Sequence, residues 1–204
     1  MIRSTVLTAA LLLPTLASGA SPEDLIGAMD IELGDLLPGP ASTTHPLQGP
    51  SHPDMFDVPT ALGVVVPIEG SSMALIATDE AATIDDGLDF DFPPGGMLGD
   101  HATLRFALQV PEDAHSFSFD FFFLSREYPE YVGNIYNDQF SVHIDDGSGP
   151  MQIVFDAFGN PVDVNNALFT LTNPTALAGT GFSQHGATGW VTTIAPVTGG
   201  SQLE

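Results

Sequence analysis

Four side chains whose carboxylate or amide oxygens could bind a metal ion, and three tyrosines, are concentrated in one short stretch, Ser125 to Asp138. These residues are Glu127, Tyr128, Glu130, Tyr131, Tyr136, Asn137 and Asp138. Pro129 and Gly133 disfavour a regular helix or strand ladder within the stretch, so we expect a shaped loop. Binding residues concentrate on loops that a rigid scaffold positions. The sequence therefore predicts that this loop carries a ligand-binding site.

The acids and the amide of this loop have the chemistry of a calcium site. Calcium takes about six to eight oxygens from carboxylates, amides and backbone carbonyls, and the predicted ligands are Glu127, Glu130, Asn137 and Asp138. The segments Asp85-Asp86-Gly87 and Asp145-Asp146-Gly147 offer similar oxygens. The alternative is that these acids keep the protein soluble, cap turns and accept hydrogen bonds from nearby amides. No segment matches a complete EF-hand loop, so both interpretations stay open.

Two further chemistries are compatible with the same residues. Glu127 and Glu130 can be compared with the carboxylate pair of a glycosidase, but a spacing of three around a proline does not fix their separation. The three tyrosines can form a platform for a sugar or protein ligand, or can pack the loop onto the fold. The six histidines are dispersed singly, without the close spacing of a zinc site, and are expected on the surface or in turns.

The elements that must hold this loop are predicted to be β-strands. Phe117, Phe119, Phe121 and Phe123 alternate with polar residues, which is the period of a strand with one buried face. Alternation or short apolar runs predict further strands, and Trp190 is expected in the core. The predicted ranges are Leu62–Val66, Met73–Thr78, Ala102–Val110, Phe140–Ile144, Met151–Phe155, Ala167–Leu171 and Trp190–Ile194.

Many short strands separated by Gly, Pro and Asn indicate an all-β fold, with an antiparallel β-sandwich of jelly-roll-like form as the expected architecture. One short helix is expected after the leader, with Ser21 as N-cap and Pro22 in the first turn. Residues 37–59 show no sustained period. We expect a signal peptide at 1–20, the helix and an irregular segment at 21–60, and a single β domain at 61–204.

Composition limits the compartment and the partners. Residues 1–20 combine Arg3, an apolar run and small residues, which is typical of a secretory signal peptide, so we expect a secreted or cell-surface protein. Removal of this leader leaves Arg105 and Arg126 against 26 acidic residues, so nucleic-acid binding is excluded. The chain has no cysteine, and no later segment offers the ~20 apolar residues of a membrane helix.

The loop and the strand before it resemble a known family. Ser125, Glu127-Tyr128-Pro129-Glu130-Tyr131-Val132-Gly133 and Tyr136-Asn137-Asp138-x-Phe140, after a phenylalanine-rich strand, are similar to the motif of the choice-of-anchor L domain. The resemblance extends more weakly over residues 67–194, including Asn165-Asn166. It implies an exported bacterial surface module with no established catalytic activity. We expect its partner to be an extracellular glycan or a surface protein.

The chain differs from the family pattern in two places. Arg126 stands where the family usually has an acid, which removes one potential ligand and provides an internal counter-charge. The sequence also lacks a strand and an acidic segment that members carry after the position of Trp190. We expect either a truncated sequence or a domain without its last C-terminal strand, whose open sheet edge can accept a strand from a partner.

These observations predict a non-enzymatic exported binding module for surface adhesion or matrix interaction, with calcium as the candidate stabilising ion. The alternative is a carbohydrate-binding module, or a carbohydrate-active enzyme that uses Glu127 and Glu130. A structural surface-layer component without a ligand is a third possibility.

Overall fold

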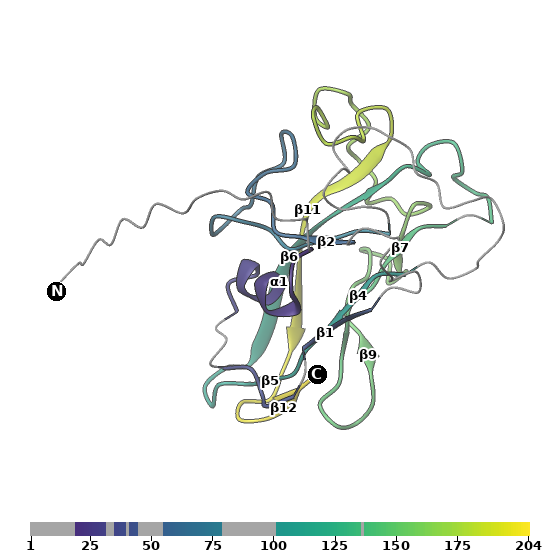
Figure 1. Cartoon of the computed structure of the whole chain (residues 1–204). Coiled ribbons are helices and arrows are strands. Elements are labelled where there is room, and N and C mark those ends of the chain that lie inside the picture. Colours follow the sequence, from purple (N-terminus) through teal and green to yellow (C-terminus); the bar gives the residue numbers. More distant parts are fainter. Residues whose placement is uncertain (1–18, 32–34, 40, 45–54, 79–100, 136) are drawn as a thin grey trace, which may run out of the picture.

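The computed structural model describes residues 19–31, 35–39, 41–44, 55–78, 101–135 and 137–204. In these ranges the chain forms one short helix and twelve strands (Figure 1), which confirms the predicted all-β class. The helix is α1 (Pro22–Ala28). The strands are β1 (Ser42–Thr44), β2 (Phe56–Asp57), β3 (Leu75–Ile76), β4 (Thr103–Arg105), β5 (Leu108–Gln109), β6 (Ser116–Ser125), β7 (Gln139–Phe140), β8 (His143–Ile144), β9 (Met151–Gln152), β10 (Val162–Asp163), β11 (Gly186–Pro196) and β12 (Gln202–Leu203).

The longest strands, β6 and β11, pair antiparallel and form a two-stranded ribbon, called the β6–β11 ribbon below. As predicted, the alternating phenylalanines of β6 lie on one face. Phe121 is buried and stacks on Phe140 with 4.6 Å between the ring centroids. Phe123 meets the same ring at 6.2 Å and the ring of Phe169 edge-on at 5.4 Å. This face therefore anchors the segments on both sides of the predicted loop.

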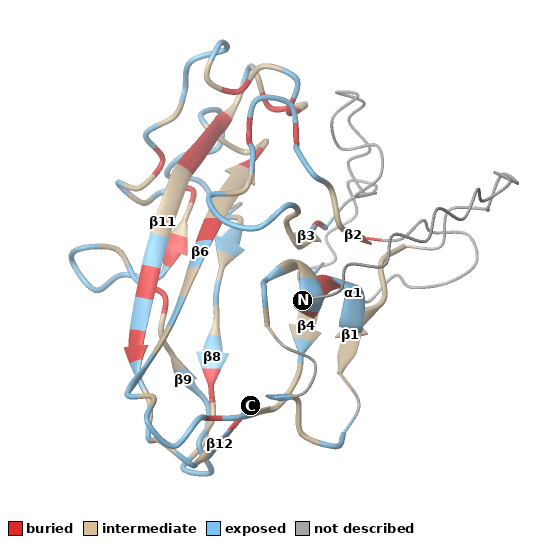
Figure 2. Cartoon of the chain, turned by 90° about the vertical axis from the view of Figure 1, so that its left-hand side faces the viewer, coloured by how far each residue is buried: buried red, intermediate tan, exposed pale blue. Residues whose placement is uncertain are grey.

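The other face of the ribbon is more open to solvent. Trp190 is half-buried and packs edge-on against Phe122 at 5.5 Å, so its contact lies on the face opposite the phenylalanine row. Further along β11, Thr192 and Ile194 point to the same side and are exposed. Figure 2 shows this alternation of buried and exposed residues along β11.

The remaining strands form short antiparallel pairs: β1 with β4, β2 with β3, β5 with β12, β7 with β10, and β8 with β9. Among the described residues, many of the buried side chains gather in three separate clusters. The clusters are centred on Val110, Ile144, Ala195 and Leu203; on Leu25, Met55 and Phe56; and on Phe121, Val154 and Val162. In Figure 2 the β6–β11 ribbon with β8 and β9 lies on one side, and α1 with β1 and β4 on the other.

Helix α1 begins as the sequence predicts. The Ser21 hydroxyl accepts a hydrogen bond from the Asp24 amide at 3.1 Å, while the Asp24 carboxylate accepts one from the Ser21 amide at 3.1 Å. This reciprocal pair is a capping box and satisfies two amides that the helix itself leaves unpaired. The apolar side of the helix is buried through Leu25 and Ile26.

Two predicted strands are wrong. Residues 62–66 form a tight turn in which Leu62 and Val65 exchange hydrogen bonds, because Gly63 takes a positive φ of 56° against the backbone of Gly179. Residues 167–171 form a turn stabilised by the Asn166 side chain, which accepts from the Leu168 amide, and only Leu171 bridges to β11. In both places, local turn contacts outweigh the apolar composition that favoured a strand.

Other strand boundaries also differ from the prediction. The predicted strand Ala102–Val110 is interrupted between β4 and β5, where the Leu37 amide donates to the Ala107 carbonyl. The segment predicted to be irregular contains β1 and β2, and β10 was not predicted. The chain also ends in a short strand, β12, and Glu204 exchanges two backbone hydrogen bonds with Asp145.

Residues 1–18, which make up most of the predicted leader, lie outside the described residues, as does Asp85-Asp86-Gly87. Within the described ranges, no helix has the length and apolar character needed to cross a bilayer.

Candidate functional site

Residues 126–138, called the corner loop below, connect β6 to β7. The loop folds as a series of tight turns, with the Tyr131 amide donating to the Glu127 carbonyl at 2.8 Å and the Asn134 amide to the Tyr131 carbonyl at 2.9 Å. The Tyr128-Pro129 peptide bond is cis, and Gly133 has a φ of 80°. The predicted irregular loop is therefore a compact turn structure with defined internal hydrogen bonds.

The base of the corner loop is closed by a ring of three hydrogen bonds. The Ser125 hydroxyl donates to the Asp138 carboxylate, the Asp138 amide donates to the Glu127 carboxylate at 2.8 Å, and the Glu127 amide donates to the Ser125 hydroxyl at 3.0 Å. Ser125 is buried, and the other two residues are half-buried. Since each residue of the ring both gives and receives a hydrogen bond, the two ends of the loop are fixed to each other.

A second network connects the tip of the loop to the end of β10 and the residues that follow it. The Gly133 backbone amide donates to the Asn165 side-chain oxygen, and the Asn165 side-chain Nδ2 donates to the Asn137 side-chain oxygen at 2.7 Å. Asn137 in turn donates to the Asp163 carboxylate at 3.0 Å. Four polar groups from two distant segments thus hold the distal part of the loop in place.

An aromatic contact fixes the middle of the loop. The Tyr128 ring stacks on Phe169, with 5.3 Å between the centroids and 23° between the planes. Gly186 lies directly beneath it, where a β-carbon would come within 2.4 Å of the tyrosine ring. The half-buried Tyr128 therefore packs the loop onto the start of β11.

A polar and aromatic group flanks this contact. The guanidinium carbon of Arg126 lies 5.3 Å from the centre of the Phe182 ring, in cation–π geometry. The His185 ring meets Phe182 edge-on at 6.4 Å, and its Nδ1 lies 4.0 Å from the Glu130 carboxylate. Arg126 thus packs against an aromatic residue under the loop.

The outer surface of the loop exposes large apolar side chains. Ile135 is 88% exposed, Val132 47% and Tyr131 43%. Glu130, which directly precedes Tyr131 in the sequence, has a side chain that is 65% exposed. Apolar side chains held outward on a hydrogen-bonded scaffold are typical of an interaction surface rather than of a core.

The structure brings some of the predicted site residues together and separates the roles of others. Glu127 and Asp138 meet in the ring, Asn137 belongs to the second network, and Tyr128 packs inward. Glu130 and Tyr131 point to the exposed side, and Tyr136 lies outside the described residues. In the part of the chain that the structure describes, no group of three or more His, Asp or Glu side chains is arranged to hold a metal ion.

Several residues that shape the site could not be assigned a role from sequence. Asp163, Asn165, Phe169 and His185 contact the corner loop from segments about thirty to sixty positions further along the chain. The Asn165-Asn166 pair is part of the family resemblance, but nothing in its spacing indicates a contact with Asn137. Such pairings depend on the tertiary fold.

The Asp145-Asp146-Gly147 segment, a second predicted source of calcium ligands, forms a turn between β8 and β9. Asp145 accepts hydrogen bonds from the amides of Gly147 at 2.8 Å and Gly149 at 3.0 Å. The Ser148 hydroxyl donates to Asp146 at 2.6 Å and, with the Ser148 amide, holds the pKa of that carboxyl below its ordinary value. These acids therefore cap their own turn.

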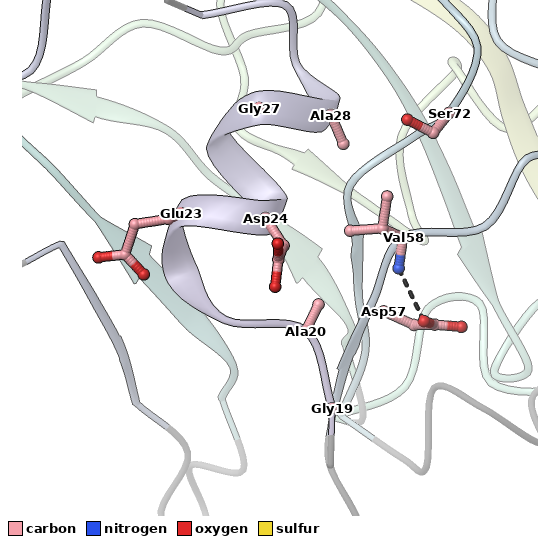
Figure 3. A pocket seen from close by; sticks show the side chains of 9 residues that line it. All are labelled: Gly19, Ala20, Glu23, Asp24, Gly27, Ala28, Asp57, Val58 and Ser72. Carbon is pink, nitrogen blue, oxygen red and sulfur yellow. Dashed lines mark hydrogen bonds between the residues drawn. The ribbon is translucent and has the colours of Figure 1, made fainter. Parts of the chain in front are cut away.

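A hollow of about 590 Å³ lies beside helix α1 and is open to solvent. Figure 3 shows it between the first turn of the helix and the segment of Asp57 and Val58. Glu23, Asp24 and Asp57 line it, but Asp24 binds the helix cap and Asp57 accepts from the Val58 amide at 2.8 Å. The corner loop, with its exposed apolar tip, is the stronger candidate site.

Comparisons with models of known protein families, with curated protein sequences and with solved structures give no significant match for this chain.

Proposed function

We propose that this protein is an exported, non-enzymatic binding module of the choice-of-anchor L type, which acts in surface adhesion or matrix interaction. In this proposal, the strands form a jelly-roll-like β-sandwich that holds the corner loop outward. The ligand is an extracellular glycan or a surface protein, and the module functions outside the cell. The motif from Ser125 to Asp138 supports the family, and the composition supports export and excludes nucleic acid.

The observation that carries the proposal is the contrast between the two sides of the corner loop. On the inner side, Ser125, Glu127 and Asp138 are engaged with one another and Tyr128 stacks on Phe169. On the outer side, Tyr131, Val132 and Ile135 are exposed although they are apolar. A loop fixed in advance loses little conformational entropy on binding, so its exposed apolar tip is suited to contact a partner.

The different surroundings of Glu127 and Glu130 support binding rather than hydrolysis. A glycosidase needs one carboxyl group to protonate the leaving group and another to act as base or nucleophile. Glu127 accepts the Asp138 amide and Glu130 faces His185, so the two acids have different structural partners. Enzymatic use of Glu127 and Glu130 remains the alternative, and its test is the turnover of chromogenic glycosides and its loss in Glu127→Gln and Glu130→Gln.

Calcium stabilisation is a separate proposal. Glu127 and Asp138 are the pair of predicted ligands that the fold brings into contact, and the strongly negative chain attracts divalent cations. Glu130 and Asn137 would complete the ligand set, together with backbone carbonyls of the loop.

The binding proposal is tested with fluorescently labelled protein on a glycan array and on intact producing cells, with and without chelator. Ile135→Asp and Tyr131→Ala should reduce binding at least about tenfold if the tip is the contact surface. Phe158→Asp is the matched control, because Phe158 is 82% exposed on a different loop. Equal loss in the control, or no binding of the wild-type protein to either surface, would contradict the proposal.

A further inference from the structure

Strand β11 has an outer edge that is unpaired in the described part of the chain. Its ladder partner is β6, and its other bridge joins Ala187 near its start to Leu171. The Val197 amide donates to the His115 carbonyl at 3.2 Å, so Val197 and His115 form a hydrogen-bonded pair of the ladder. Counting back in steps of two, the odd-numbered residues of β11 down to Val191 also direct their backbone groups toward β6. Because hydrogen-bonded and non-hydrogen-bonded pairs alternate, the backbone groups of Trp190, Thr192 and Ile194 point away from β6.

This edge lacks the usual features that prevent pairing with another strand. Natural edge strands are protected by charged residues, prolines, bulges or very short length. Here the bulge between Ala187 and Trp190 and the proline at position 196 lie at the two ends. Between them, residues 190–195 read Trp-Val-Thr-Thr-Ile-Ala, an uncharged stretch of mostly aromatic and β-branched residues with high strand propensity.

We propose that this edge pairs antiparallel with the same edge of a second copy of the chain, about a two-fold axis centred on Thr192. In this register, Thr192 lies opposite Thr192 of the second copy, and Trp190 lies opposite Ile194 of the second copy on both sides of the axis. All three outward-facing residues then exchange backbone hydrogen bonds. The two sheets become one continuous four-stranded sheet, with the order β6, β11, β11 and β6.

The side chains make a second copy the best occupant of the edge. Ile194 is 69% exposed, and the half-buried Trp190 lies on the same face, so the symmetric register covers each exposed isoleucine with an indole ring. Aromatic and β-branched residues form favourable cross-strand pairs. A strand from an unrelated protein could accept hydrogen bonds from the same amides. Only a second copy provides a tryptophan opposite Ile194 and an isoleucine opposite Trp190 by symmetry.

The negative charge of the chain does not prevent the contact. Asp120 is the acid that β6 places on this face, and it accepts a hydrogen bond from Thr192 at 2.5 Å. In the dimer, the two Asp120 residues are separated by three strand spacings, about 14 Å. This exceeds the screening length of roughly 8 Å at physiological ionic strength. The contact is small, so the dimer is expected to be weak and concentration-dependent.

The register is tested by disulfide formation, since the chain has no cysteine and a single introduced cysteine reports only on pairing between copies. Thr192→Cys places two cysteines opposite each other with about 5.5 Å between α-carbons, within the range of a disulfide. Ile194→Cys is the control, because its counterpart in the second copy is Trp190. We expect covalent dimer from the first variant and not from the second under mild oxidation. Equal yields, or no covalent dimer, would overturn the register.

Sedimentation equilibrium tests the association itself. The wild-type protein should form dimers at concentrations up to about 500 µM, and Ile194→Lys should weaken them about tenfold or more by disrupting both Trp190–Ile194 pairs. Ser118→Lys is the matched control: it adds the same charge on the same face, directly across from Ile194 but on β6. A wild-type protein that stays monomeric over this range, or equal effects of both lysines, would refute the proposal. Circular dichroism confirms that each variant is folded.

Discussion

The buried hydroxyl of Ser125 donates a hydrogen bond to the carboxylate of Asp138, thirteen positions further along the chain. Ser125 is the last residue of β6, and Asp138 directly precedes β7. The contact therefore closes the corner loop where the loop leaves and rejoins the sheet, and Glu127 completes the ring. Glu127 and Asp138, which the sequence predicts to be ligand-binding residues, thus also fix the conformation of the corner loop.

Substitution of Ser125 should destabilise the protein. Ser125→Ala removes a hydroxyl that donates to the Asp138 carboxylate and accepts from the Glu127 amide, so the ring loses two of its three hydrogen bonds. We expect a loss of about 1 to 3 kcal/mol in the free energy of unfolding, measured by urea denaturation. Ser118→Ala, at an exposed position of the same strand, is the control. Equal stability of the two variants would show that the ring is not a stabilising element.

The space under Tyr128 can be tested with matched glycine substitutions. Gly186→Ala forces the tyrosine ring to move away from Phe169 and should cost about 1 to 3 kcal/mol. Gly27 lies in helix α1, and a β-carbon added there would have no atom within 4 Å. Because alanine favours a helix more than glycine does, Gly27→Ala should stabilise the protein by about 0.5 to 1 kcal/mol. Thermal unfolding distinguishes the two, and a neutral Gly186→Ala would argue against the packed arrangement.

The two faces of β6 predict different costs for neighbouring phenylalanines. Phe121 is buried and stacked on Phe140, so Phe121→Ala should destabilise the protein by about 3 to 5 kcal/mol. Phe122 is half-buried on the opposite face, against Trp190. Phe122→Ala should therefore lower the free energy of unfolding by clearly less than Phe121→Ala. Chemical denaturation of both variants measures the difference, and the reverse order would show that the faces are misassigned.

Two surface acids should titrate at unusually low pH. Hydrogen bonds from Ser21 to Asp24, and from Ser148 to Asp146, lower the pKa of each carboxyl from its ordinary 3.8. Because the folded-state pKa is the lower one, each ionised carboxylate contributes stability above the unfolded pKa. This contribution is lost as the pH falls through the folded value. Carboxyl NMR titration should show Ser148→Ala raising the midpoint of Asp146 but not that of Asp24.

Calcium should raise the unfolding midpoint if the corner loop holds the ion. Linkage predicts ~2.7 kcal/mol of added stability at a hundredfold excess over the dissociation constant. Glu130→Gln is the informative variant, since Glu130 is exposed and outside the ring, so it should reduce the response to calcium without lowering stability in EDTA. Asp113→Asn, at an exposed turn acid, is the control. An unchanged midpoint at millimolar calcium would exclude a tight site.

Alternation predicted the main strands well because it records burial directly. Burial alternates over residues 116–121 of β6 and 192–196 of β11, and both segments form strands, although β11 (Gly186–Pro196) is longer than the predicted Trp190–Ile194. Short apolar runs were less informative. Residues 62–66 have the composition of a strand, yet a close contact between Gly63 and Gly179 turns the chain there.

The candidate site was located by its sequence motif, but its internal contacts were not. Spacing alone could not show that Glu127 binds the Asp138 amide while Glu130 turns toward His185. The partners Asn165 and Phe169 reach the loop only after the chain has passed through β7 to β10. Their contribution depends on long-range packing, which a local pattern does not contain.

The β6–β11 ribbon joins the segment just before the corner loop to the segment that follows His185, so the sixty residues between them are enclosed by one long pairing. A single proteolytic cut within the loop would therefore leave two fragments, each contributing one strand to the ribbon. We expect the nicked protein to stay together as a non-covalent complex, and the two halves to be suitable for expression as separate chains that reassemble.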